Sequence, residues 1–107
     1  MDVKQLDKYQ DAAWDLALEQ SRTWQYLFPG LVSEVGELAE LYAKGVRDGF
    51  PRDLDKHVKN ELGDILWFIA CLGRYCGFRL GDIAQANIEK LRSRRDRGVL
   101  QGSGDER

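Results

Sequence analysis

Apolar residues recur at intervals of three and four along nearly the whole chain, and no segment alternates apolar and polar residues convincingly. An α-helix has about 3.6 residues per turn, so this spacing gathers the apolar side chains of a segment on one helical face. The pattern predicts four helices, at about residues 3–22, 29–47, 53–77 and 81–95. We therefore expect an all-α fold with 107 residues in one domain.

Residues that begin or end helices mark the predicted boundaries. Pro29 suits the first turn of the second helix, where its missing N–H costs nothing. The segment 48–53, Asp-Gly-Phe-Pro-Arg-Asp, has the composition of a turn, and Asp53 or Asp55 is available as the N-cap of the third helix. Gly77 is a good C-terminal stop for that helix.

The last residues differ in composition from the rest. Residues 1–100 form the predicted domain, and residues 101–107 form a polar, glycine-rich tail that composition alone predicts to be flexible. Gly102 and Gly104 flank Ser103, and backbone N–H groups in such a segment can form a concavity that binds an anion. A domain this small buries only about two-thirds of its unfolded surface, which favours subunit association.

Charge and hydropathy exclude several classes of protein. The net charge of −2 and the pI of about 5.4 argue against general nucleic-acid binding. No apolar run approaches the roughly 20 residues of a membrane helix, and the N-terminus lacks the apolar stretch of a signal peptide, so we expect a cytoplasmic protein. Cys71 and Cys76 are expected to be free thiols that pack in the interior.

The most informative motif is a tetrapeptide that occurs twice, as Glu34–Glu37 and as Glu61–Asp64. Each copy places two acids three residues apart, so the two side chains lean from one face of their helix. Each copy also contains a helix-interior glycine, Gly36 or Gly63, which costs about 1 kcal/mol relative to alanine. The two glycines suggest that the helix backbones approach each other closely.

The two copies match in position if their helices form an antiparallel hairpin that turns about residue 49. In that register Glu34 lies level with Asp64, and Glu37 lies level with Glu61. Four carboxylates then meet at one height between two helices.

Four clustered carboxylates repel one another and are costly to remove from water. A hard divalent cation relieves that cost, and ligation by oxygen alone indicates Mg²⁺, with Mn²⁺ as a substitute. No Cys lies near the acids and the single His is not adjacent to them, which disfavours Zn²⁺. The alternative is that the acids are ordinary surface residues of two amphipathic helices.

The sequence around these two acidic motifs resembles that of a known family, the MazG-like nucleoside triphosphate pyrophosphohydrolases of the all-α NTP pyrophosphatase superfamily. The family motif is E-x-x-E followed by E-x-x-D, and it is matched here by Glu34, Glu37, Glu61 and Asp64. Asn87 to Lys90 resembles the family's N-x-x-K element, and residues 97–105 are similar to the tail of its short members. The resemblance covers about residues 6–105.

The resemblance implies an activity and an assembly. It implies that the four acids bind Mg²⁺ and that a nucleoside or deoxynucleoside triphosphate is hydrolysed between its α and β phosphates. The products would be a nucleoside monophosphate and pyrophosphate, and the reaction would help to control the nucleotide pool. The expected architecture is a four-helix protomer with an antiparallel metal-binding pair, assembled into a helical-bundle homodimer or homotetramer whose sites draw on more than one chain. Glu34 and Glu37 are both candidates to orient or deprotonate the attacking water.

Further residues are candidates for substrate contacts. Cations would bind phosphates and aromatic side chains would stack on the base, although such cations also stabilise helix ends and such aromatics more often form a core. The candidates are Lys44, Asn87, Lys90, Arg94 and Arg95 for polar contacts, and Trp24 and Phe68 for stacking.

Three alternatives stay open beside this interpretation. The same site could hydrolyse phosphoribosyl-ATP or a guanosine polyphosphate alarmone. A non-enzymatic helical oligomerisation module would need no metal. A di-iron four-helix protein is disfavoured because it needs E-x-x-H pairs, and the chain contains none.

Overall fold

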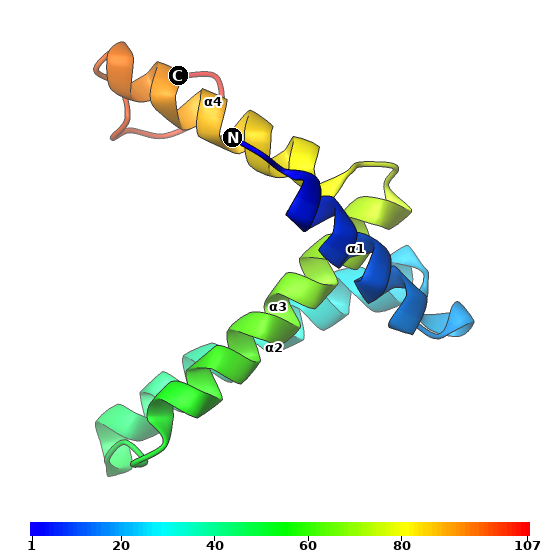
Figure 1. The fold of residues 1–107 in the computed structure, drawn as a ribbon. Helices are drawn as coiled ribbons and strands as arrows, with labels where there is room; N and C mark the ends of the chain where they lie inside the picture. Colours follow the sequence, from blue (N-terminus) through cyan, green and yellow to red (C-terminus); the bar gives the residue numbers. More distant parts are fainter.

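The computed structural model describes residues 1–107 and contains helices, one short 3₁₀ segment and no strand (Figure 1). The helices are α1 (Lys4–Leu16), η1 (Glu19–Ser21), α2 (Trp24–Asp48), α3 (Leu54–Tyr75) and α4 (Leu80–Asp96). The predicted all-α fold is confirmed. None of the helices combines the length and the apolar character that crossing a membrane requires.

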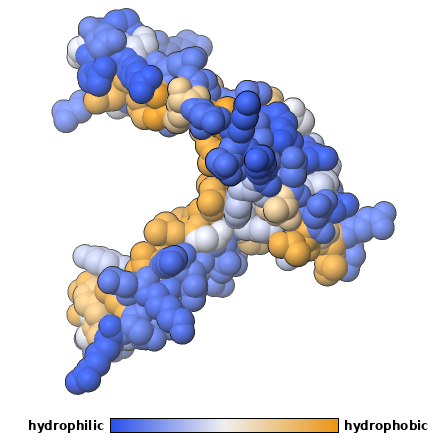
Figure 2. All heavy atoms as spheres, viewed as in Figure 1, coloured by the Kyte–Doolittle hydropathy of each residue, from blue (hydrophilic) through white to orange (hydrophobic).

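The helices form two arms that diverge from one junction. α2 and α3 run side by side as a long antiparallel hairpin, and α4 leaves the other end of α3 at a wide angle (Figure 1). α1 lies across the junction, where it contacts both α3 and α4. Figure 2 shows that the space between the arms is open and that hydrophobic side chains line much of its inner side.

A buried glutamine on α1 fixes the junction. Gln10 is fully buried, and its Nε2 donates hydrogen bonds to the carbonyl oxygens of Ala70 (3.0 Å) and Phe78 (2.9 Å). Its Oε1 accepts a hydrogen bond of 2.9 Å from the backbone N–H of Leu80, the first residue of α4. One side chain therefore satisfies backbone groups of α3, of the loop after it and of α4.

Acidic residues of α1 reinforce the same contact. Asp7 Oδ1 accepts a hydrogen bond of 2.8 Å from the N–H of Gly81, and Asp11 Oδ1 accepts one of 2.9 Å from Arg79. Arg79 lowers the pKa of Asp11 through this hydrogen bond and through its charge. α4 thus has its first N–H groups capped by another helix, which sets its direction.

The hydrophobic core is small and sits at the junction. Its buried members come from α1, α2, α3 and the start of α4: Ala13, Leu27, Phe68, Ala70, Cys71 and Leu80. Trp67 packs against this cluster and donates a hydrogen bond of 3.1 Å to the carbonyl oxygen of Ala13. The far half of the α2–α3 hairpin keeps large apolar side chains exposed, including Tyr42 and Val46.

Two predicted boundaries were wrong by more than a turn. α1 ends at Leu16, because the backbone of Ala17 is extended, and η1 follows. α2 begins at Trp24, since Thr23 Oγ1 caps it by accepting a hydrogen bond of 3.3 Å from the backbone N–H of Tyr26, and Pro29 lies inside the helix. A proline near the start of a helix removes one backbone hydrogen bond, and the packing of α2 on α3 tolerates that loss.

Two smaller expectations also need correction. Cys71 is buried, and burial raises the pKa of its thiol to about 11, but Cys76 is exposed where α3 ends. A methyl group added at Gly36 or Gly63 would meet nothing within 4 Å, so neither glycine is needed for close packing of α2 on α3. The close approach occurs instead at Gly30, where a methyl group would overlap the ring of Phe68.

The C-terminal tail is held against α4 rather than extended. Arg94 donates a hydrogen bond of 2.8 Å to the carbonyl oxygen of Asp105. Arg107 donates to the carbonyl oxygens of Val99 (3.1 Å) and Leu100 (2.9 Å). The segment 101–107 therefore folds back over the last turns of the helix.

Candidate metal centre

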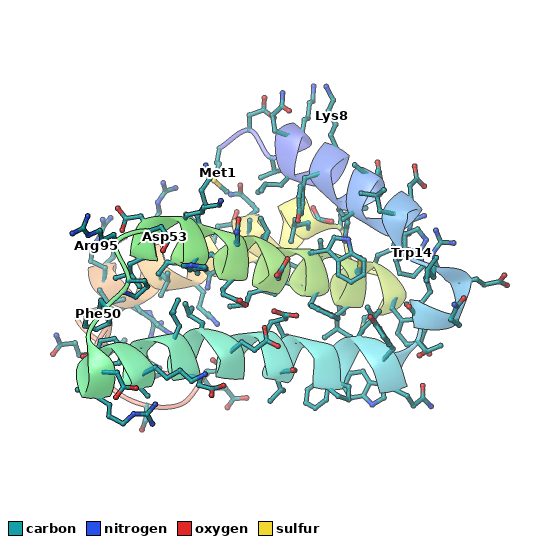
Figure 3. The ribbon with its side chains drawn as sticks, turned by 90° about the horizontal axis from the view of Figure 1, so that it is seen from below. Met1, Lys8, Trp14, Phe50, Asp53 and Arg95 are labelled. Atoms are coloured by element: carbon teal, nitrogen blue, oxygen red, sulfur yellow. The ribbon has the colours of Figure 1, made fainter.

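Three of the four motif acids meet between α2 and α3. Glu34, Glu61 and Asp64 each offer a carboxylate oxygen, and these atoms all lie within 4.8 Å of one another. The hairpin that joins the two helices turns between Phe50 and Asp53, and Figure 3 shows the side chains of both helices meeting along its length. The structure thus supports the predicted antiparallel register for three acids, while Glu37 lies outside this trio.

The three carboxylates of the trio repel one another and lack hydrogen-bond partners for two of their oxygens. Glu34 Oε2 and Glu61 Oε2 are both buried and have no hydrogen-bond partner. Desolvation, the close approach of the Glu61 carboxyl group and the charges of Glu37 and Asp64 raise the pKa of Glu34 to about 7. Buried carboxylate oxygens without partners are costly, and a cation is the partner that would satisfy both of them.

The donor set fits a hard divalent cation. All three side chains of the trio are carboxylates, and oxygen ligands suit Mg²⁺ and Mn²⁺. Two of the carboxylates are half-buried and Asp64 is exposed, so the trio is open to solvent and to a ligand on one side.

Glu37 lies in an open hollow beside the trio. The hollow has a volume of about 180 Å³, and Glu61 lines it as well, so that the hollow and the trio are continuous. Lys44 also lines it, paired with Glu40 at 3.1 Å. The predicted phosphate contact Lys44 is therefore brought close to the acids.

Residues outside the predicted site also lie near the acids. Glu40 and His57 line the hollow, and His57 Nε2 is 3.2 Å from Asp53 Oδ2. The four-residue spacing of both ion pairs was the available signal in the sequence. Tyr9 of α1 is a further case, because burial and the charges of Cys71 and Asp64 raise the pKa of its phenol.

The two aromatic candidates differ in exposure. Phe68 is 8% exposed and packs edge-on against Trp67, so in this protomer it is a core residue and offers no open face to a base. Trp24 is 48% exposed and stacks on Phe28, with ring centroids 4.8 Å apart. The stacking surface that remains accessible is the pair at the start of α2.

The polar candidates on α4 lie on the other arm of the molecule. Asn87 and Arg95 are exposed, Lys90 is 3.5 Å from Asp105, and Arg94 is buried beneath the tail. Because α4 diverges from the hairpin, the structure does not bring these residues to the acids of the same protomer (Figure 1).

The fold and the site are those of an all-helical protein in which an antiparallel helix pair carries a carboxylate cluster suited to a divalent cation. Comparison with protein families matches residues 22–99 to the MazG nucleotide pyrophosphohydrolase domain, which includes α2, α3 and α4. The chain belongs to this family.

A relative from a phage supports the same assignment. The chain is similar to the Gene 37 protein of Mycobacterium phage L5, with 38% identity over 112 residues. The similarity covers 95% of this chain and 98% of that protein. No solved structure matched the chain.

Proposed function

We propose that the protein hydrolyses nucleoside or deoxynucleoside triphosphates between the α and β phosphates, in a reaction that depends on Mg²⁺ or Mn²⁺. One water is consumed, and the products are a nucleoside monophosphate and pyrophosphate, so the reaction would serve nucleotide pool control. Membership of the MazG family supports nucleotide pyrophosphohydrolase activity in general. The observation that carries the metal dependence is the trio Glu34, Glu61 and Asp64 with its two buried, unpartnered oxygens.

The trio would hold the cation, with Glu37 available from the adjoining hollow. When bound, a divalent cation neutralises phosphate charge, polarises the phosphoryl group and lowers the pKa of a bound water. A cluster of acids alone repels a triphosphate, so substrate binding requires this compensation.

Glu37 is the acid that we propose to orient and deprotonate the attacking water. It lies beside the trio without belonging to it, and it faces a hollow large enough to admit solvent. Glu34 was an equal candidate from the sequence, but its carboxylate is committed to the cluster, where Oε2 is buried. A general base must reach the water, and the open position of Glu37 permits that contact.

Lys44 and Trp24 are the substrate contacts that we propose from the same protomer. Lys44 lines the hollow with Glu37, and its ion pair with Glu40 is exposed, so a phosphate can replace the glutamate at little cost. Trp24 begins α2, the helix that carries Glu34, and remains half exposed.

We further propose that the active unit is a homodimer or homotetramer. A site formed by two chains would allow Asn87, Lys90, Arg94 and Arg95 of one protomer to approach the acids of another. The apolar surface supports this proposal, because an open groove of about 450 Å³ between α2 and α3 is lined by eight hydrophobic residues. Burying such an apolar groove against a second protomer lowers the free energy of association.

A nucleotide panel tests the proposed function. The purified protein is incubated with the canonical nucleoside and deoxynucleoside triphosphates, phosphoribosyl-ATP and a guanosine polyphosphate, with Mg²⁺ or with a chelator, and the products are separated by ion exchange. We expect monophosphate and pyrophosphate in equal amounts, only with the metal. Glu61→Gln should abolish turnover with the fold intact, whereas Glu19→Gln, which removes an equal charge from η1, should not. Turnover by the Glu61→Gln variant, or no turnover of any compound, would contradict the proposal.

A further inference from the structure

The C-terminal tail places a carboxylate between two cations of α4. Asp105 Oδ1 lies 3.5 Å from Lys90 Nζ and 3.6 Å from Arg94 Nη2. The charges of these two cations, first that of Lys90, lower the pKa of Asp105. The chain therefore supplies its own anion to a basic site on the helix.

The tail satisfies Arg94 only in part. The residue is 4% exposed, and its Nη2 donates to the carbonyl oxygens of Gly104 (3.4 Å) and Asp105 (2.8 Å). Its Nε is buried and has no partner. A guanidinium group presents a fork of donors that matches an oxyanion with two or more oxygens. The tail accepts hydrogen bonds from Nη2 and leaves Nε without an acceptor.

The ionic contact made by Asp105 is easily exchanged. Its side chain is 89% exposed, and exposed ion pairs contribute little because solvent and salt screen them. Gly102 and Gly104 both have positive φ values, +150° and +87°, so the fold-back depends on turns that glycine adopts easily. A phosphate group carries more charge and more acceptor oxygens than a carboxylate and competes well for the same cations.

We infer that Asp105 is an internal competitor for the phosphate contacts proposed above for Lys90 and Arg94, and that its carboxylate takes the place of the phosphate in the structure. Binding of phosphate or pyrophosphate displaces the Asp105 carboxylate and releases the tail from α4. The tail therefore lowers the apparent affinity of the site for such anions. The inference rests on the proposed function for the role of Lys90 and Arg94 and for the choice of anion, since pyrophosphate is the product proposed above.

Calorimetric titration of the metal-free protein tests the inference. Pyrophosphate and inorganic phosphate are titrated separately at about 0.15 M salt into the wild type, Asp105→Asn and Glu106→Gln. Glu106 is the matched control, because it is an exposed acid of the same tail and makes no ion pair or hydrogen bond. We expect Asp105→Asn to bind pyrophosphate about fivefold more tightly, the equivalent of an exposed ion pair, and Glu106→Gln to match the wild type.

Lys90→Met supplies the opposite change, since it removes a cation and keeps the length of the side chain. It should weaken pyrophosphate binding about tenfold in the same titration. Tighter binding of pyrophosphate than of phosphate would identify the product as the ligand, and equal binding would identify any phosphate group. Equal pyrophosphate affinities for Asp105→Asn and Glu106→Gln, or unchanged affinity in Lys90→Met, would overturn the inference.

The amide signals of Gly102 and Gly104 report the tail directly by NMR. Pyrophosphate should move both signals toward unstructured positions in the wild type, and Asp105→Asn should show them moved before any anion is added. Signals that stay in place at saturating pyrophosphate would overturn the competition. Both assays omit divalent metal and turnover, so failure of the proposed hydrolysis and failure of this inference are separate results.

Discussion

Glu34→Gln should stabilise the metal-free protein at pH 8. The pKa of Glu34 is raised from 4.5 to about 7 by desolvation, by the close approach of the Glu61 carboxyl group and by the neighbouring acids. The folded state therefore binds this proton more tightly than the unfolded state does. The contribution of Glu34 to stability is fully present below about pH 4.5 and is lost as pH rises through about 7. Glutamine keeps the shape of the protonated side chain at every pH.

The size of the effect follows from the shift and from the exposure of the trio. One pKa unit corresponds to about 1.4 kcal/mol, but the trio is open to solvent on one side, and screening reduces the full value substantially. We expect a gain of about 1 kcal/mol at pH 8, which corresponds to roughly 5 °C in Tm for a domain of this size. At pH 4 the variant and the wild type should melt together.

Circular-dichroism melts between pH 4 and 8, in metal-free buffer, measure this difference. Glu40→Gln is the control, because Glu40 is on the same helix and its exposed ion pair with Lys44 contributes little. Saturating Mg²⁺ should then raise the Tm of the wild type more than that of Glu34→Gln, since a ligand stabilises the state that binds it. A Glu34→Gln variant that is less stable than the wild type at pH 8, or that shows no dependence on pH relative to it, would show that the Glu34 carboxylate does not destabilise the metal-free fold.

Two further predictions concern the junction and the hairpin. Gln10→Ala should lower the free energy of unfolding by about 3–5 kcal/mol, because two buried backbone groups and one part-buried group lose their partner. Urea denaturation measures the change, and a loss below about 1 kcal/mol would contradict the role of Gln10. Gly30→Ala should cost about 1–3 kcal/mol in the same assay, because its methyl group would overlap the ring of Phe68. Gly30→Ala that is as stable as the wild type would show that the ring moves aside freely.

The helices and the acidic pairing were predictable because both depend on local spacing. Apolar residues at helical intervals predicted four helices, and the three-residue spacing of the acids predicted that they share a face. Glu37 was not predictable in this way. A helical wheel gives the direction in which Glu34 and Glu37 point, but it does not show that only Glu34 reaches Glu61 and Asp64. The roles of the acids in catalysis stay predictions.

The direction of α4 was not predictable from local patterns. It depends on Gln10, which contacts Ala70 and Leu80 across 60 and 70 residues of sequence. From the sequence alone, a polar residue such as Gln10 is expected to face solvent. The burial of Phe68 and of Arg94 has the same origin. Each is enclosed by a segment that packs on it from elsewhere, α2 on Phe68 at Gly30 and the tail on Arg94.

The fate of the water oxygen shows whether the carboxylate cluster directs hydrolysis at the α-phosphorus. The wild type and Glu61→Gln are incubated with a deoxynucleoside triphosphate in ¹⁸O-labelled water, with Mg²⁺ or with a chelator, and ³¹P NMR locates the label. Attack on the α-phosphorus at the carboxylate cluster predicts that the label enters the monophosphate, that pyrophosphate stays unlabelled, and that both products require Mg²⁺ and Glu61. Label in the pyrophosphate, or the same products without the metal or without Glu61, would contradict the account.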